Sequence, residues 1–276
     1  NAILFDWVAS AASAAGVRPD PDWNAASFGG GAGFLDIGYD PQTGIRSSSS
    51  VAYLHPILGG RANLTVLTDT RALRVEVAAD RATGVTVAGA DRPPRTLHAT
   101  GEVILCGGAI DTPRLLLHSG IGPARALEDL GIGAVHDLPG VGARLLDHPE
   151  SIIMWELVRP LGPETTMHAD CALFVDRLPE HAICMTPNVP RPRSAGRLWL
   201  LSANPAVKPA LDFGYFTDPD GYDAATIVDG LELARQVAAT GPFSTWLKRE
   251  VAPGPQVAGR QALSHYGRAV HHTVYH

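Results

Sequence analysis

One stretch of the sequence combines residue types and spacing suited to holding a nucleotide. Residues 106–123 read CGGAIDTPRLLLHSGIGP, in which an apolar run ends at Gly107 and Gly108 and a helical segment opens at Pro113. Small residues let the backbone approach a ligand, and the first turn of a helix offers free N–H groups to phosphate. Tight packing between a strand and a helix would use the same glycines, so the pattern leaves a nucleotide site and a structural turn equally open.

Residues that could do acid–base chemistry gather at two other places. DHPE at residues 147–150 contains the carboxyl group of Glu150, and HHTVYH at residues 271–276 contains three histidines. Histidine changes its charge near neutral pH and often serves as a catalytic base. On residue type alone, Glu150 reads as a solvated loop charge and His276 as a solvated end, while His271 and His272 are nearby candidates for a base.

The elements that must position these residues are a mixture of helices and strands. Apolar residues at helical spacing, with proline and glycine as start and stop signals, predict helices over residues 1–16, 47–58, 113–120, 124–130, 217–240, 243–247 and 264–270. Period-two alternation predicts two or three antiparallel strands within residues 63–89, with turns at 79–81 and 83–84. The fold class expected from this mixture is α/β, or α+β overall.

Two further strand predictions concern the sheets around the candidate residues. Residues 102–106 form a nearly continuous apolar run, which is typical of a strand in a parallel sheet covered on both faces. The segments SIIMWELV, HAICMTPNV and GRLWLLSANP read as strands of one second sheet.

Composition excludes several classes of partner. The chain has 276 residues, of which 45% are hydrophobic and 18% charged, and its net charge is −6 with no basic cluster, so no nucleic-acid partner is expected. No run approaches the roughly 18 apolar residues of a membrane span, so no membrane partner is expected either. Three cysteines without metal-like spacing predict buried thiols, no metal site and a cytoplasmic location.

The full string GGAIDTPRLLLHSGIGP resembles the second signature of the glucose–methanol–choline (GMC) flavoprotein oxidoreductases. Other segments resemble the family's elements in the same order, namely GIRSSSSVAYLHP, NLTVLTDTRALRV, LPGVGARLLDHPE and HTVYH. The resemblance extends over nearly the whole chain and is greatest to choline-oxidising members. It implies an FAD enzyme that oxidises a primary alcohol, choline or a similar cation, by hydride transfer to flavin N5.

The resemblance also implies roles for individual residues. His276 matches the family's catalytic histidine and would be the base. Glu150 would meet the substrate's quaternary ammonium group, and Trp155 could add cation–π attraction or simply be a core residue of its strand. The residues implied for the cofactor are Ala72 at the adenine, Gly107, Gly108, Ala109 and Thr112 beside the ADP portion, and Asp147 and His148 near the flavin.

The family pattern divides the chain into an incomplete FAD-binding portion of Rossmann-like type at 1–149, a substrate portion with an antiparallel sheet and helices at 150–270, and a return to the flavin at 271–276. The GxGxxG unit that would grip the pyrophosphate is absent from the sequence, nothing follows His276, and the passage between Val175 and Cys184 is shorter than in choline-type members. His181 near this junction is not assigned the role of the further active-site histidine found there.

These departures predict an internal portion of a longer protein that binds FAD poorly by itself. The expected partners are a small-molecule alcohol and either a missing N-terminal portion or a second copy in a homodimer. Three alternatives remain, namely a relative acting on a different alcohol, a hydroxynitrile lyase on the same scaffold, and a non-catalytic fragment or partner subunit. Oxidase and dehydrogenase are both compatible with the sequence.

Overall fold

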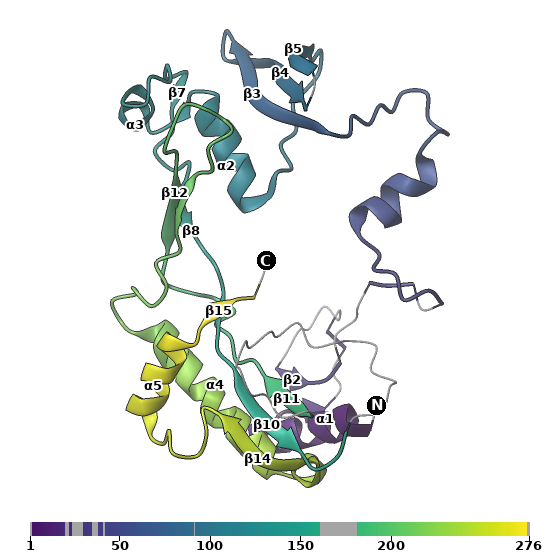
Figure 1. Ribbon diagram of the computed structural model, residues 1–276, viewed down its shortest axis with the longest axis vertical. Coiled ribbons are helices and arrows are strands. Elements are labelled where there is room, and N and C mark those ends of the chain that lie inside the picture. Colours follow the sequence, from purple (N-terminus) through teal and green to yellow (C-terminus); the bar gives the residue numbers. More distant parts are fainter. Residues whose placement is uncertain are drawn as a thin grey trace. The chain divides into compact units, whose positions relative to one another are not determined.

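The computed structural model describes residues 2–19, 22–23, 30–34, 38–40, 42–90, 92–160 and 181–274 (Figure 1). Its contacts divide the chain into two compact units. Unit 1 comprises Asn1–Arg61, His148–Pro192 and Pro219–His276, and unit 2 comprises Ala62–Asp147 and Arg193–Asp218. Compactness is a different criterion from ligand binding, so the division into a cofactor portion at 1–149 and a substrate portion at 150–270 stays a prediction.

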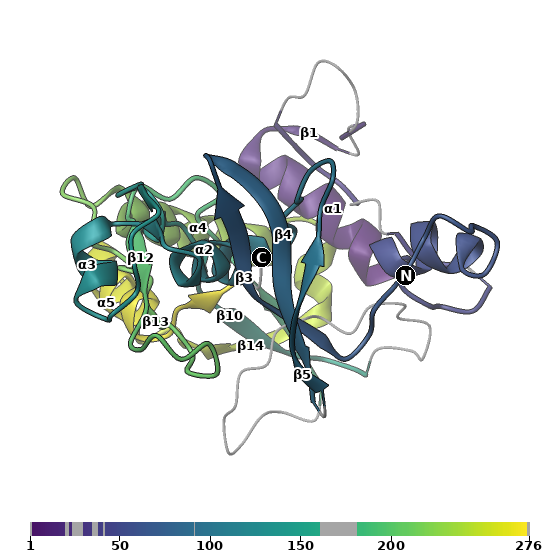
Figure 2. The ribbon, with the colours of Figure 1, turned by 90° about the horizontal axis from the view of Figure 1, so that it is seen from above.

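A three-stranded antiparallel sheet begins unit 2. Its strands are β3 (Thr70–Ala78), β4 (Arg81–Gly89) and β5 (Arg92–His98), in the order β3-β4-β5, and Figure 2 shows β3 and β4 running beside each other. Ala79 and Asp80 connect the first two strands with φ values of 49° and 60°, as a tight two-residue hairpin turn requires. The predicted antiparallel strands are confirmed.

The turn expected at residues 83–84 is wrong. Gly84 lies inside β4, where a Cβ would be 2.5 Å from the carbonyl oxygen of Leu97 on β5. The glycine is therefore needed because β4 and β5 approach each other closely here, rather than because the chain turns.

The rest of unit 2 packs two short helices against a second sheet. Helix α2 (Gly108–His118) and helix α3 (Ala124–Glu128) flank the parallel pair β6 (Ile121–Gly122) and β7 (His136–Asp137), and a further sheet has the order β13-β12-β8. The strands of that sheet are β8 (Ala143–Leu145), β12 (Gly196–Trp199) and β13 (Ala210–Asp212). A small core joins them, formed by Leu117, Leu127, Leu198 and Leu200.

Helix α2 begins five residues before its predicted start. Pro113 lies inside the helix rather than at its first position. The side chain of Thr112 accepts a hydrogen bond from the Gly107 N–H at 3.0 Å and so closes the preceding turn. The helix therefore extends to the N-terminal side of Pro113, although an interior proline removes one N–H donor and crowds the carbonyl group four residues before it.

The predicted buried strand at residues 102–106 is wrong for the part of the chain that is described. This run is assigned to no strand, and its Ile104 side chain is 78% exposed. A strand is defined by its hydrogen-bonded neighbours, and apolar composition does not supply them. Cys106 at the end of the run is exposed for the same reason, contrary to the expectation of buried thiols, whereas Cys184 is partly buried and Cys171 lies outside the described residues.

Unit 1 packs three helices around another antiparallel sheet. The helices are α1 (Ala2–Ala15), α4 (Tyr222–Ala239) and α5 (Arg260–Ala269), and the sheet has the order β11-β10-β14. The strands are β10 (Ile153–Leu157), β11 (Ala182–Met185) and β14 (Leu247–Ala252). Phe243, in the 3₁₀ turn Pro242–Trp246, is fully buried with Ile3, Leu157 and Val237. Figure 1 shows α4 and α5 side by side, where Gly267 lets α5 approach Ile227 of α4.

The three later strand predictions are correct as strands and wrong as one sheet. SIIMWELV and HAICMTPNV contain β10 and β11, which pair with each other, but GRLWLLSANP contains β12 of unit 2. The sequence pattern of a segment can indicate that it forms a strand, but it does not indicate which other strand it pairs with. Helix α4 likewise begins at Tyr222, after Gly221 at φ 66°, rather than at residue 217.

The shortest elements complete the description. A π-helix (Ser50–Leu54) and a 3₁₀ turn (His55–Ile57) occupy the position of the helix expected at 47–58. Strand β1 (Arg18–Pro19) pairs in parallel with β2 (Gly31–Ala32), and β9 (Pro149–Glu150) pairs antiparallel with β15 (His272–Thr273). Within the described ranges, every helix is too short or too polar to cross a bilayer.

Candidate cofactor and substrate sites

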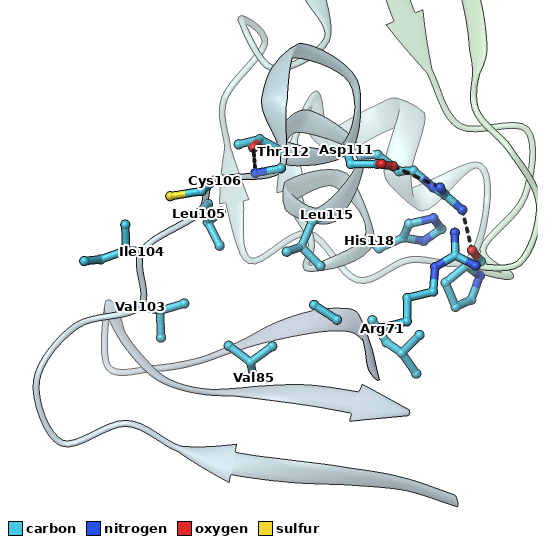
Figure 3. A pocket seen from close by; sticks show the side chains of 15 residues that line it. Arg71, Val85, Val103, Ile104, Leu105, Cys106, Asp111, Thr112, Leu115 and His118 are labelled. Atoms are coloured by element: carbon cyan, nitrogen blue, oxygen red, sulfur yellow. Dashed lines mark hydrogen bonds and ion pairs between the residues drawn. The ribbon is translucent and has the colours of Figure 1, made fainter. Parts of the chain in front are cut away.

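An open cavity of about 360 Å³ lies in unit 2 between β3 and the start of α2 (Figure 3). Three of the residues predicted to hold the cofactor line it, namely Ala72 on β3 and Gly107 and Thr112 at the helix start. Gly108 and Ala109 continue into α2 and are not among its lining residues. The structure therefore brings together residues that are 40 positions apart in the sequence, beside the exposed run that ends at Cys106.

The backbone geometry at the start of α2 favours glycine at both Gly107 and Gly108. A Cβ at Gly107 would lie 3.0 Å from the backbone nitrogen of Thr112, and Gly108 has a φ of +76°. The glycines thus form a turn at the start of α2, although the strand that the packing alternative assumed is absent from the described residues before it. The turn is compatible with the ligand interpretation, since it forms one wall of the cavity.

Positive charge and a partly buried imidazole on α2 also line the cavity. Arg114 is 8% exposed and donates to Asp111 at 3.1 Å and to the carbonyl oxygen of Pro205. His118 follows one helical turn later, and its Nε2 is buried without a hydrogen-bond partner among the described residues. Burial lowers the pKa of His118, and the charges of Arg114 and Arg71 lower it further.

We expect His118 to make the protein less stable in acid. Its pKa in the folded protein lies below the ordinary value of a histidine, about 6.5, so the unfolded chain binds the proton more readily and the free energy of unfolding falls as the pH drops below about 6.5. His118→Leu removes the group that takes up this proton, so the variant should lose less thermal stability than the wild type between neutral and mildly acidic pH. Differential scanning calorimetry at both pH values measures the fall in melting temperature. The exposed His136→Leu is the matched control, and equal acid sensitivity of His118→Leu and wild type would contradict the assignment.

A second group of candidate residues surrounds β9 in unit 1. Glu150 is only 4% exposed, contrary to the solvated loop charge that its type suggests. It is the register partner of His272 on β15, whose Nδ1 lies 3.2 Å from Glu150 Oε1. The N–H of Val274 donates to the carbonyl oxygen of His148 at 3.3 Å, so the pairing continues past β15. His276, the predicted base, lies two residues further on, outside the described residues.

Trp155 and Asp147 occupy different surroundings. Trp155 is 5% exposed in the central strand of the β11-β10-β14 sheet, opposite Ile183 and Glu250, which favours the core interpretation, and its cation–π role stays a prediction. Asp147 is 7% exposed in unit 2 and accepts a hydrogen bond from the hydroxyl group of Tyr215. A structural hydrogen-bonding role for Asp147 agrees with this contact.

Comparison with known proteins decides the family. The GMC oxidoreductase family model matches residues 2–150 by its N-terminal part and residues 192–276 by its C-terminal part. The chain belongs to the GMC oxidoreductase family. GMC oxidoreductases are FAD-dependent enzymes, so FAD is the cofactor that membership of this family assigns.

The curated relatives of this GMC chain include enzymes named for different reactions. Choline oxidase of Arthrobacter globiformis is 38% identical in an alignment that covers 89% of this chain and 50% of the relative. The chloroplastic fatty acid photodecarboxylase of Chlamydomonas reinhardtii is 29% identical, with 98% of this chain and 56% of the relative covered. The chain therefore spans about half the length of the curated relatives it matches.

Solved structures show the same fold. Pyridoxine 4-oxidase from Mesorbium loti superposes with a TM-score of 0.84 at 22% identity, covering all of this chain and 58% of that one. This likeness supports the GMC fold of helices and several small antiparallel sheets. In the described ranges, no group of three or more His, Cys, Asp or Glu side chains is arranged to hold a metal ion.

Three features of these sites were not predicted from the sequence, namely the place of His118 in the cavity, the contact of His272 with Glu150 and the contact of Tyr215 with Asp147. His118 stands inside the quoted signature, four residues after Arg114, and this spacing on a helix could have shown that the two share a face. The contact of His272 with Glu150 depends on the register of two-residue strands, and Tyr215 reaches Asp147 from 68 residues away. Neither of these two contacts could be predicted from a sequence pattern.

Proposed function

We propose that this chain is part of an FAD-dependent oxidase or dehydrogenase acting on choline or a similar cationic primary alcohol. The observation that carries the proposal is the buried carboxyl group of Glu150 on β9, in the DHPE segment that the choline-type resemblance assigns to the substrate's ammonium group. A carboxylate that is shielded from water attracts a nearby cation more strongly than an exposed one does, and a quaternary ammonium ion is such a cation. The 38% identity to choline oxidase supports the same substrate class.

The described residues suit FAD in the cavity beside α2. A volume of about 360 Å³ is at the lower end for small-molecule sites, so it suits the ADP portion better than the whole dinucleotide. Gly107 keeps the wall of the cavity free of a side chain, and the backbone of Ala72 lies on the facing strand. We propose these residues and Thr112 as contacts of the ADP portion, and Asp147 and His148 as supports of the loop near the flavin.

The proposed reaction divides the work between cofactor and chain. When bound, the flavin supplies the acceptor for the hydride that leaves the alcohol carbon. Glu150 binds and orients the cationic end of the substrate, and His276 accepts the proton of the hydroxyl group, so the primary alcohol becomes an aldehyde. Residues beyond the printed sequence would complete the grip on the pyrophosphate, because no GxGxxG unit occurs in these 276 residues.

Absorption spectroscopy tests the proposal. The whole protein is expected to carry flavin at stoichiometric level, and its visible bands should bleach when choline is added without oxygen. A polypeptide of these 276 residues alone should carry little flavin, since it lacks the pyrophosphate-binding unit.

Each outcome of this experiment has a distinct meaning. Bleaching by another primary alcohol and not by choline would replace the substrate. Bound flavin that no alcohol bleaches would favour a non-catalytic protein. Stoichiometric flavin on the 276-residue polypeptide would contradict the need for further residues.

A further inference from the structure

The segment that leads to the proposed base is held against the proposed cation-binding carboxylate by two short strands. β15 pairs antiparallel with β9, with His272 opposite Glu150 and Thr273 opposite Pro149. Beyond the strands, the N–H of Val274 donates to the carbonyl oxygen of His148. Directly opposed residues of an antiparallel pair have side chains close together, so this register brings the imidazole of His272 to the Glu150 carboxyl group.

The contacts of the imidazole fix which ring nitrogen carries a proton. Nδ1 of His272 lies 3.2 Å from Glu150 Oε1 and 3.0 Å from the carbonyl oxygen of Thr273. Both of these atoms accept hydrogen bonds when the carboxyl group is ionised, so Nδ1 is the donor to both. The Glu150 side chain is 6% exposed and that of His272 is 23% exposed, so the hydrogen bond is largely shielded from water.

A histidine suits this position for a reason of charge. Lysine or arginine beside Glu150 would carry a positive charge and cancel the carboxylate, whereas a neutral imidazole donates one hydrogen bond and leaves the negative charge in place. A shielded carboxylate that keeps its charge attracts a cation more strongly than an uncharged molecule of the same shape.

We propose that His272 is a positioning residue that determines substrate specificity. Its Nδ1–H holds the Glu150 carboxylate in one orientation, so that the site prefers a cationic alcohol to a neutral one. This inference rests on the proposed function, because it presumes that Glu150 meets the substrate's cation. The imidazole itself touches neither the substrate nor the flavin in this role.

Two substitutions separate positioning from mere packing. His272→Asn keeps a neutral N–H donor near the position of Nδ1, and His272→Leu removes the donor. In the flavin-loaded whole protein, calorimetry gives the dissociation constants of choline and of its uncharged analogue, in which a tert-butyl group replaces trimethylammonium. We expect the preference for choline to fall about tenfold or more in His272→Leu, since hydrogen bonds to buried charges are among the stronger ones. His272→Asn should keep most of the preference.

A matched control and a spectroscopic readout complete the design. His271→Leu changes the neighbouring histidine, whose Nδ1 contacts the carbonyl oxygen of Arg268 instead, and should leave the preference unchanged. In histidine-selective NMR, the Nδ1–H resonance of His272 should move upfield in Glu150→Gln, because a neutral amide is a weaker acceptor than a carboxylate.

The outcomes distinguish the inference from the function on which it rests. If Glu150→Gln leaves the His272 resonance unchanged, the contact is absent and the inference is overturned for any substrate. If the resonance moves but His272→Leu keeps the full preference for choline, the positioning role is overturned while the proposed function stands. If the wild-type protein shows no preference for choline, the proposed function fails and the specificity role with it.

Discussion

Glu150→Gln is expected to weaken binding of choline by about 30-fold or more while changing the affinity for its uncharged analogue little. Glu150 is 4% exposed, so its charge acts on a bound cation with little screening by water. Glutamine has nearly the same shape and can still accept a hydrogen bond from His272, so the substitution removes the charge and keeps the packing. Calorimetric titration of the flavin-loaded protein with both ligands measures the two affinities.

Glu156→Gln is the matched control for this substitution. Glu156 lies on β10, where Lys248 and Arg249 contact its two carboxylate oxygens at 2.6 and 2.7 Å, and these hydrogen bonds lower its pKa. Both basic side chains are more than half exposed, so this pair is a surface interaction of small energy. An equal loss of choline affinity in Glu150→Gln and Glu156→Gln would mean that overall charge, rather than a binding contact, is responsible. Unchanged affinity in Glu150→Gln would remove the main argument for a cationic substrate.

Gly196→Ala is expected to destabilise unit 2 by about 3 kcal/mol or more. Gly196 begins β12, and a Cβ there would lie 1.8 Å from the carbonyl oxygen of Asp212 and 2.6 Å from the carbonyl carbon of Phe213. Both atoms belong to the backbone, so no side-chain rotation relieves the overlap and β12 must move away from β13. Urea denaturation followed by circular dichroism measures the loss as a lower midpoint.

Gly101→Ala serves as the control for the same change of residue. A Cβ at Gly101 meets nothing within 4 Å, so this substitution should change the free energy of unfolding by less than about 1 kcal/mol. If both variants unfold at the same urea concentration, the tight approach of β12 to β13 is not present in the protein.

Local elements were predictable from the sequence because their causes are local. The hairpin of β3 and β4 follows from period-two alternation on both sides of a two-residue turn, and α1 follows from helical spacing that ends at Gly16. The family was also predictable, since the signature at residues 107–123 is long and ordered, and the family model matches both halves of the chain. These features need no knowledge of distant residues.

Features that depend on distant partners were not predictable. The apolar run at residues 102–106 has the composition of a buried strand, yet no described strand pairs with it. The burial of Glu150 depends on β15, which follows it by more than a hundred residues. For the cavity, the sequence supplied Ala72, Gly107 and Thr112 through a resemblance to the family, whereas His118 became visible only through its burial beside Arg114.

The two compact units also constrain the order in which this protein can fold as it is synthesised. Unit 1 is assembled from three separate stretches of the chain, and unit 2 lies between them in sequence. Helix α1 precedes most of its packing partners in the chain, and Ser10 in that helix accepts a hydrogen bond from the N–H of Phe243, 233 residues later. The sheet around β10 likewise becomes complete only after β14, which lies later in the chain, has been synthesised. During synthesis the apolar face of α1 therefore stays uncovered until these later segments have been made, and chaperones that hold nascent chains would have this surface to bind.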